Sequence, residues 1–491
     1  MEQGRGDLID ELEARGLVQT LTSRSLRTHL AAAPRVVYSG VDPSASSLHV
    51  GNLLPLLTLA HFARYGHRPI VLVGGATGSI GDPSGRSTER NALDKDTLTA
   101  NVNGIKSQLR TFFHNVNSYY TNPPHSSDST NTALSSGAKA EEVGEGELGM
   151  GVKLMNNYDW MAGVSLLDFL GSVGRHARLT QMLARDSVAS RLQPTSHSSS
   201  GGMSYTEFSY QLLQAYDFSY LHRTSSCTVQ LGGSDQLGNI SAGIDLIRRT
   251  TGGLSRLQDD PAYGLTLPLL TTASGEKFGK SAGNAVWLDP LRTSDVEFYQ
   301  FFLRSSDADV AKYLRALTLL PPSSIEETLA QHAESPKRRV AQRVLADHIT
   351  RLIRGEKAAE KSKALTDVLF SHTTTSSSNE DAAEAVRTAL ERLNVTELSE
   401  SDGVVARLSR DRVVGEDLTR LAVGAGLVKS RAEAKRMLAG GALYVNNRQI
   451  NLNSTEATTV QEHDLVSARD AQGGLCLLRA GKNAVRIVHV V

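Results

Sequence analysis

Three apolar segments of the chain each run into a turn of small residues, and this repeated pattern limits the fold more than any other feature. The segments are Val36–Tyr38, Ile70–Val73 and Thr228–Leu231, and a helix-like segment follows each turn. Apolar strands that alternate with helices are typical of a parallel sheet covered on both faces. The sequence therefore predicts an α/β fold with a doubly wound parallel sheet, in which ligands bind beyond the carboxyl ends of the strands.

The composition indicates several domains and no long-range attraction for nucleic acid. The chain has 491 residues, and Lys+Arg and Asp+Glu both total 52, so any RNA must be held by local basic patches. Cys227 and Cys476 lie far apart and give neither a disulfide framework nor metal-ligand spacing. No apolar run approaches the roughly 20 residues that a membrane span requires, so we expect no membrane partner.

Two short motifs carry residues suited to phosphates: His49–Asn52 (HVGN) and Lys277–Ser281 (KFGKS). A small-residue turn at the start of a helix presents free backbone N–H groups and the helix dipole to anions. Two lysines around a glycine suit a mobile loop that closes over a departing pyrophosphate. Taken singly, the histidine fits a helix cap and the lysines fit an exposed basic loop. Their joint occurrence favours a nucleotide site.

In this order the two motifs resemble the paired signatures of class I aminoacyl-tRNA synthetases. The segments Tyr38–Ser44 (YSGVDPS) and Gly232–Gln236 (GGSDQ) narrow the resemblance to the tyrosyl-tRNA synthetases, and the chain is similar to their fungal mitochondrial subgroup. The resemblance implies a Rossmann-like catalytic domain and a tyrosine–tRNA ligase. Such an enzyme joins L-tyrosine to ATP as tyrosyl-adenylate, releases pyrophosphate, and transfers tyrosine to the terminal ribose of tRNA(Tyr).

The same resemblance implies a role for individual residues. Adenylate formation requires that the reacting groups are aligned and that the charge on the phosphates is stabilised. A carboxylate can accept a hydrogen bond from a phenol hydroxyl and can also pair with an ammonium group. The implied catalytic residues are His49, Asn52, Lys277, Lys280 and Ser281, and Arg86 and Arg90 form the basic pair of a mobile loop. Those implied for tyrosine are Tyr38, Asp82, Tyr210, Gln214, Asp217 and Gln236. Those implied for ATP are Gly40, Asp42, Ser44, His49, Gly51, Asn52, Gly233, Asp235, Lys277 and Lys280.

Further expectations concern two departures from the family's motifs, the cofactors and the core residues. Asn52 stands where the commonest first signature has a second histidine, and Ser44 stands where threonine is usual, but both keep a hydrogen-bonding side chain. ATP is expected as a substrate with Mg²⁺ on its phosphates, and no metal is expected to be bound by the protein itself. Cys227 and Trp160 are interpreted as core residues.

The domain boundaries follow changes in composition. We expect a catalytic domain over 1–292, with insertions near 121–151 and 194–202, and an α-helical anticodon-region domain over 293–370. A linker over 371–403 leads to a small α+β domain over 404–491, which resembles an S4-type RNA-binding module. Its candidate RNA-binding residues are Lys429, Arg431, Lys435 and Arg436, although a solvated basic face is the alternative.

Partners and location follow from the resemblance. It implies a homodimer with Leu166–Arg191 at the interface. Some fungal mitochondrial tyrosyl enzymes also stabilise group I introns, so intron RNA stays open as a second partner, although the insertion near 121–151 is acidic. The subgroup implies the mitochondrial matrix, with a presequence not visible in this chain, and the cytoplasm is the alternative. The acidic amino terminus is unlike an Arg-rich transit peptide. A non-translating nucleotidyltransferase would leave the second motif unexplained.

Overall fold

The computed structural model describes residues 7–84, 93–121, 146–185, 188–189, 203–251, 260–276, 278–281, 284–370, 386–388, 390, 404–450, 458–467, 473–481 and 484–491. The chain forms two compact units, of which the first holds Met1–Leu288 and Ser306–Leu329 and the second holds Asp289–Ser305 and Ala330–Val491. The predicted domain boundaries stay predictions. Among the helices of the described ranges, none combines the length and the apolar character that crossing a membrane requires.

A sheet of six strands forms the centre of the first unit, and its strands lie in the order β1-β6-β5-β2-β3-β4. All neighbours are parallel except β1 and β6. The three predicted strands are confirmed and lengthened, whereas β1, β4 and β6 were not predicted. The bounds are β1 Thr20–Leu21, β2 Val36–Val41, β3 Arg68–Val73, β4 Lys153–Asn156, β5 Cys227–Gly233 and β6 Tyr263–Leu267.

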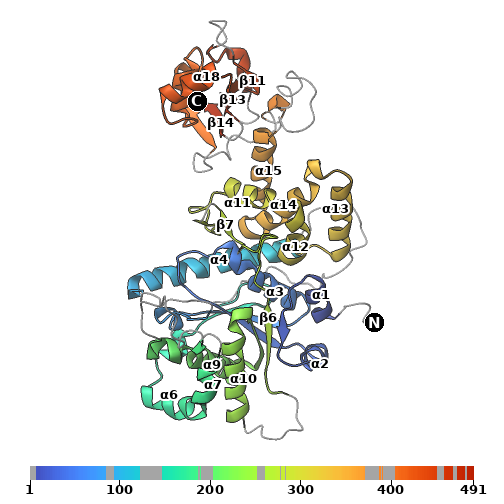
Figure 1. Ribbon diagram of the computed structural model, residues 1–491, viewed down its shortest axis with the longest axis vertical. Helices are drawn as coiled ribbons and strands as arrows, with labels where there is room; N and C mark the ends of the chain where they lie inside the picture. The colour runs from blue at the N-terminus through green and yellow to red at the C-terminus, as the bar shows by residue number, and fades with distance from the viewer. Residues whose placement is uncertain are drawn as a thin grey trace. The chain divides into compact units, whose positions relative to one another are not determined.

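Helices cover both faces of this sheet, with α3 (Leu53–Arg64) and α4 (Lys95–Thr121) above the strands and α9 (Tyr205–Ser225) and α10 (Leu237–Thr250) below them (Figure 1). Successive side chains of a strand point to opposite faces. Tyr38 of β2 and Leu72 of β3 therefore share a face and pack with Phe218 of α9 and Ile240 of α10. The other elements of this unit are α1 Leu8–Ala14, α2 Leu26–Ala32, α5 Tyr158–Met161, α6 Leu166–Ser172, α7 Leu179–Leu183, α12 Asp307–Leu317, β7 Lys280–Ser281 and β8 Asn284–Ala285. Helix α13 Pro322–Glu334 begins in this unit and ends in the second.

The strand order reverses direction between β2 and β5. After β2 the chain adds β3 and β4 on one side, and later places β5 and β6 on the other side. In open parallel sheets such a reversal leaves a crevice at the carboxyl ends of the two central strands. Tyr38 is paired with Ile70 on β3 and with Gln230 on β5, so the turns that follow all three strands meet at this crevice.

Helix α1 connects α3 with α12. The buried Arg15 guanidinium donates to three carbonyl oxygens in and just after α12, at 2.7–3.2 Å. The Glu11 carboxylate accepts from Arg15 at 2.9 Å and from the Tyr65 hydroxyl, just beyond α3, at 2.6 Å. A buried charged network of this kind fixes geometry, because removing one member leaves another charge unpaired.

Helix α12 in turn supports residues 271–278, which lead into the second motif. The Asp309 carboxylate accepts from the backbone N–H of Ala273 at 2.7 Å, and the Lys312 ammonium donates to the carbonyl of Thr271 at 3.0 Å. The rings of Phe278 and Tyr313 lie 4.6 Å apart between centroids. The start of the second motif is therefore held by α12.

The second unit joins helices to a second sheet. Its helices are α11 Asp295–Leu303, α14 Val340–Arg354, α15 Glu356–Phe370, α17 Leu418–Gly424 and α18 Arg431–Ala439. Its strands are β9 Val405–Leu408, β10 Leu443–Val445, β11 Arg448–Gln449, β12 Val466–Ser467, β13 Gly474–Ala480 and β14 Ala484–Val490, in the order β11-β10-β13-β14-β9 with β12 beside β13.

The two faces of this second sheet cover different cores. Leu478 and Val488 pack against α17 and α18, whereas Leu477 and Ile487 pack against Leu365 and neighbouring residues of α15. Val386 and Leu390, which lie in the segment predicted as a linker, are buried in the latter core. The carboxyl-terminal sheet is thus packed on helix α15 within one unit.

Candidate functional site

A cavity of about 600 Å³ lies at the carboxyl edge of the sheet in the first unit. Its walls come from the turns after β2, β3 and β5, from the first motif and from helix α9. It brings together most of the site residues expected from the sequence, namely Tyr38, Gly40, Asp42, His49, Asn52, Asp82, Tyr210, Gln214, Asp217, Gly233, Asp235 and Gln236. Segments nearly 200 residues apart in sequence thus line one cavity.

A buried carboxylate and a buried phenol lie at the sheet end of this cavity. Asp217 is 3% exposed, and burial raises its pKa to about 7 although two hydrogen bonds oppose this shift. Burial, followed by the negative charge of Asp217, raises the pKa of Tyr38 well above its usual value. In the described part of the chain the Tyr38 hydroxyl has no hydrogen-bond partner. The pair therefore offers an acceptor and an uncommitted hydroxyl to a ligand.

Two residues that we did not predict hold the Asp217 carboxylate. The Asn157 amide donates to it at 3.0 Å and the Trp160 indole N–H donates at 2.8 Å. Asn157 also donates to the Thr77 hydroxyl at 2.9 Å, and the Trp160 ring stacks on Tyr220 at 4.4 Å between centroids. The expectation that Trp160 is a core residue is confirmed, since it is buried, but it also belongs to the site.

A hydrogen-bonded polar network also lines the cavity. The Gln236 amide donates to the Asp82 carboxylate at 2.7 Å, and the Gln214 amide donates to the Gln236 carbonyl oxygen at 3.1 Å. The Asn239 amide donates to Gln214 at 3.1 Å. Burial, followed by the charges of Asp82 and Asp42, raises the pKa of Tyr210 well above its usual value. The network is acidic and oriented by its own bonds, which suits a cationic group.

The first motif forms a short turn before α3 whose bonds fix the state of His49. The imidazole Nδ1 accepts from the backbone N–H of Gly51 at 3.0 Å, while the backbone N–H of His49 donates to Asn52 Oδ1 at 3.0 Å. Burial lowers the pKa of His49. The ring is therefore neutral near pH 7 with its proton on Nε2, so it donates a hydrogen bond to a ligand without carrying charge.

Several predicted residues lie away from the cavity wall or beyond the described ranges. Ser44 and Gly51 are exposed and do not line the cavity. The backbone of Lys280 and Ser281 forms β7, which pairs with β8. Arg86, Arg90, Lys277 and the side chains of Lys280 and Ser281 lie outside the described residues. The four predicted RNA-binding cations Lys429, Arg431, Lys435 and Arg436 are exposed at and before α18. Within the described ranges no cluster of three His, Cys, Asp or Glu side chains is placed to hold a metal.

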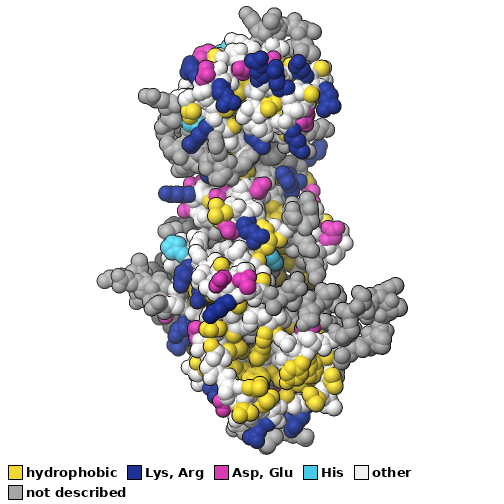
Figure 2. Space-filling view, turned by 90° about the vertical axis from the view of Figure 1, so that its left-hand side faces the viewer, with side chains coloured by type: hydrophobic (Ala, Val, Ile, Leu, Met, Phe, Trp, Pro, Cys, Tyr) yellow, Lys and Arg dark blue, Asp and Glu magenta, His cyan; other side chains and the backbone are white. Residues whose placement is uncertain are grey.

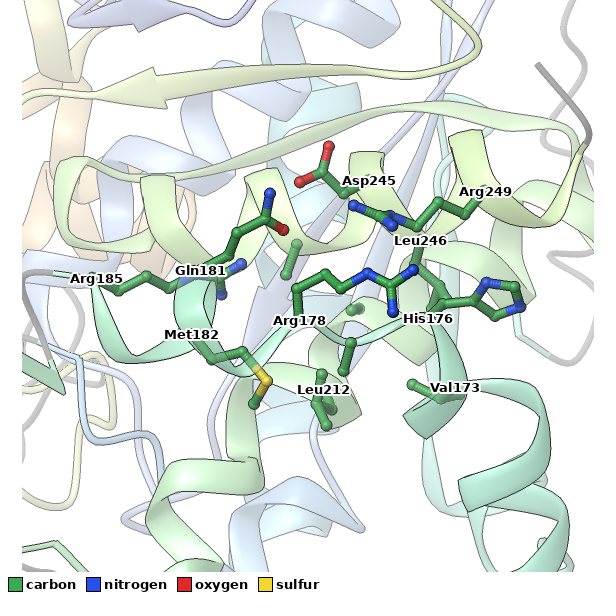
Figure 3. A pocket seen from close by; sticks show the side chains of 13 residues that line it. Val173, His176, Arg178, Gln181, Met182, Arg185, Leu212, Asp245, Leu246 and Arg249 are labelled. Atoms are coloured by element: carbon green, nitrogen blue, oxygen red, sulfur yellow. The ribbon is translucent and has the colours of Figure 1, made fainter. Parts of the chain in front are cut away.

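A second, smaller pocket between α7 and α10 is rich in cations (Figure 3). Arg178, Arg185, Arg249 and His176 line it, and the carboxylate of Asp245 lines it as well. Burial lowers the pKa of Arg185, and its Nη1 has no hydrogen-bond partner among the described residues. We did not predict this pocket, because its cations are spread over 178–249 and form no run in the sequence.

Comparison with known proteins agrees with this geometry. The family of tRNA synthetases class I (W and Y) matches residues 31–371. The chain therefore belongs to this family of class I aminoacyl-tRNA synthetases. A tyrosine–tRNA ligase of Roseiflexus castenholzii is 40% identical over 99% of this chain and 99% of its own length. Within the family, the activity of this chain is accordingly that of a tyrosine–tRNA ligase.

Fungal mitochondrial relatives are also similar. The mitochondrial tyrosine–tRNA ligase of Saccharomyces cerevisiae is 43% identical over 74% of this chain and 70% of its own length. The crystal structure of a C-terminally truncated mitochondrial tyrosyl-tRNA synthetase of Aspergillus nidulans is 33% identical, with a TM-score of 0.63, and covers 74% of this chain and 95% of that chain. The predicted Rossmann-like catalytic fold and the likeness to the fungal mitochondrial subgroup are confirmed.

The pKa of Asp217 predicts how tyrosine binding depends on pH. Because this pKa is raised to about 7, the carboxyl group gains a proton as the pH falls below that value and then accepts the substrate phenol poorly. We expect the affinity for tyrosine to rise between about pH 6 and about pH 8, by up to about tenfold per pH unit below the pKa. Equilibrium binding of tyrosine at several pH values measures this effect.

The control for this measurement is Asp217→Asn, which removes the titrating group and should flatten the profile. An affinity for tyrosine that stays constant or falls as the pH rises in the unmodified protein would contradict the assignment of Asp217.

Proposed function

We propose that the cavity carries out both steps of tyrosine–tRNA ligation. In the first step the tyrosine carboxylate attacks the α-phosphate of ATP, and pyrophosphate leaves. Mg²⁺ would accompany the phosphates as part of the substrate and offset their charge. In the second step the terminal ribose hydroxyl of tRNA attacks the tyrosyl-adenylate, and AMP leaves. The observation that carries this proposal is that one cavity holds a phenol-specific end, an ammonium-specific network and a helix start with donors.

The phenol end selects tyrosine. The substrate hydroxyl donates to Asp217 and accepts from Tyr38, whose hydroxyl has no other partner among the described residues. Asn157 and Trp160 keep the carboxylate oriented while leaving lone pairs for the substrate. Phenylalanine supplies no hydroxyl, so the buried Tyr38 hydroxyl stays unpaired and the Asp217 carboxylate lacks its third donor; a buried polar group left unpaired costs about 1–3 kcal/mol.

The ammonium network and the first motif align the reacting groups. Asp82 supplies the negative charge for the substrate ammonium, and Tyr210, Gln214 and Gln236 supply neutral oxygen atoms around it. On the other side, the neutral His49 donates from Nε2 toward the phosphates at the start of α3, where the helix dipole favours anions. The ribose and the backbone of the amino acid are surrounded by Gly40, Gly233, Asp42 and Asp235. The phosphates are contacted by His49 together with Asn52 and the second motif.

The roles of His49 and Lys280 are tested by alanine substitution. If both act mainly on charge that develops in the transition state, His49→Ala and Lys280→Ala lower the first-order rate of adenylate formation by about 10²–10³. Single-turnover kinetics of tyrosyl-adenylate formation and equilibrium binding of tyrosine measure the two quantities separately.

Tyrosine affinity should change little in either variant, and Lys95→Ala, which removes an exposed lysine at the start of α4, serves as the matched control. A collapse of tyrosine affinity with an intact first-order rate would show that the assigned roles are wrong.

We propose that tRNA binds cations on both units. On the first unit, Arg178, Arg185 and Arg249 offer guanidinium groups to backbone phosphates, and the Nη1 of Arg185 has no partner among the described groups. On the second unit, the S4-like segment offers exposed cations at and before α18. The helical segment 293–370, of which 306–329 belong to the first unit, is the proposed anticodon-region domain. Since the chain carries no net charge, these local clusters must supply the attraction.

Substitution of these cations separates RNA binding from chemistry. Arg249→Ala and Arg431→Ala should each weaken binding of tRNA(Tyr) and lower the slope of log affinity against log salt by about one unit per lost phosphate contact. Filter binding over a range of salt concentrations measures both effects. Tyrosine-dependent exchange of pyrophosphate into ATP should stay unchanged.

Arg24→Ala, which removes an exposed arginine outside both clusters, is the control. Point variants are preferable to truncation of the tail, because removal of β13 and β14 would expose the apolar residues of α15 that pack on them. If the slope of log affinity against log salt concentration is unchanged in both variants, these two clusters do not contact the phosphates of tRNA.

We propose a homodimer that buries the apolar surface of α6 and α7. Leu166 and Leu167 are 73% and 80% exposed, and Leu170, Leu179 and Leu183 are also exposed. Figure 2 shows hydrophobic side chains gathered on the face of the first unit that carries these helices. A contiguous apolar surface of this kind is typical of a protein–protein interface.

We propose the mitochondrial matrix as the location, on the basis of the mitochondrial relative from Saccharomyces cerevisiae. Group I intron RNA stays a predicted second partner. The insertion near 121–151, which bears on that prediction, falls largely outside the described residues.

A further inference from the structure

One short segment, residues 286–288, joins the two motifs of the site. The backbone N–H of Val50 donates to the carbonyl of Val286 at 3.0 Å, and the N–H of Leu288 donates to the carbonyl of Leu48 at 2.8 Å. These bonds pair His49 with Trp287 in an antiparallel bridge. The first motif is therefore bonded on both sides of His49 to a segment that follows the second motif in sequence.

The same segment also holds the second motif. The N–H of Val286 donates to the carbonyl of Gly279 at 3.0 Å. Gly279 has φ +98°, and a Cβ atom there would lie 2.8 Å from Cγ2 of Val50 and 3.3 Å from the backbone nitrogen of Gly51. Only glycine allows this backbone conformation and this close approach without strain. The two motifs thus approach each other closely at Gly279.

The Trp287 side chain lies against the imidazole of His49. The ring centroids are 6.1 Å apart and the planes meet at 66°, which is the edge-to-face arrangement that aromatic pairs favour. The bond from Gly51 to Nδ1 fixes the tautomer of His49, and the indole restricts rotation of the ring about its side-chain bonds. The two contacts together determine where the Nε2 proton points.

We propose that Trp287 is a positioning residue for the first reaction step: it orients His49 while its backbone neighbours hold the two motifs at a fixed separation. The inference rests on the proposed role of His49 at the phosphates. Its readout is the rate of adenylate formation, because alignment affects the transition state more than the binding of tyrosine at the far end of the cavity.

The test compares Trp287→Ala and Trp287→Phe with the unmodified full-length chain. Trp287→Ala should lower the first-order rate of tyrosyl-adenylate formation by about tenfold or more, with the dissociation constant of tyrosine changed by less than about twofold. Trp287→Phe, which keeps an aromatic edge beside His49, should recover most of the rate. Phe301→Ala, which removes another half-buried aromatic ring with a partner ring at 5.1 Å, is the matched control and should leave the rate unchanged.

A double-mutant cycle makes the test specific to His49. If Trp287 acts through the imidazole, Trp287→Ala should have little further effect on the rate when His49 is already alanine. Additive losses of rate, or a loss confined to tyrosine affinity, would overturn the positioning role. If His49→Ala alone leaves the rate unchanged, the proposed function fails at His49 and the positioning role fails with it. A dissociation constant of tyrosine that is unchanged in Trp287→Ala shows that this variant keeps its folded cavity, so a loss of rate in it is not a result of misfolding.

Discussion

The parallel pairing of β2 with both β3 and β5 is the constraint on which the rest of the site depends. It brings three turns to one edge of the sheet, and the reversal of strand order between β2 and β5 leaves a crevice there. Side-chain alternation along β2 directs Tyr38 toward the face covered by α9. Residues 210, 214 and 217 lie on one side of that helix because they are separated by four and three positions. The sheet therefore determines which side chains can meet in the cavity.

Burial of Asp217 makes the site specific for a phenol, and it also makes the charged form of the Asp217 carboxylate less favourable. A carboxylate in this position is disfavoured by the loss of solvent, which is why its pKa is raised to about 7. Asn157 and Trp160 offset part of that cost by donating to both oxygen atoms. A substrate phenol adds a third donor, so the substrate completes a partly satisfied polar group. The same logic explains rejection of a substrate that lacks the hydroxyl.

Much of the fold and the cavity could be predicted from the sequence, because the signals are local. The glycine turns after three apolar strands and the four-residue spacing of Tyr210 and Gln214 were readable without a structure. The contributions of Asn157 and Trp160 could not be predicted from the sequence. These residues follow β4, which is short and gives no strand pattern, and their partner Asp217 lies about 60 residues away along the chain. The cationic pocket and the bridge between His49 and Trp287 likewise arise from tertiary contacts that no sequence spacing encodes.

The central claim is that Tyr38 and Asp217 make this cavity specific for tyrosine. Its most direct test is the ratio of kcat/KM for tyrosine to kcat/KM for phenylalanine in pyrophosphate exchange, measured for the unmodified chain, Tyr38→Phe and Asp217→Asn. We predict a strong preference for tyrosine in the unmodified chain. That preference should fall by about tenfold or more in each variant, because the buried partner of the phenol is lost. An unchanged ratio in both variants, or exchange that does not depend on tyrosine, would contradict the account.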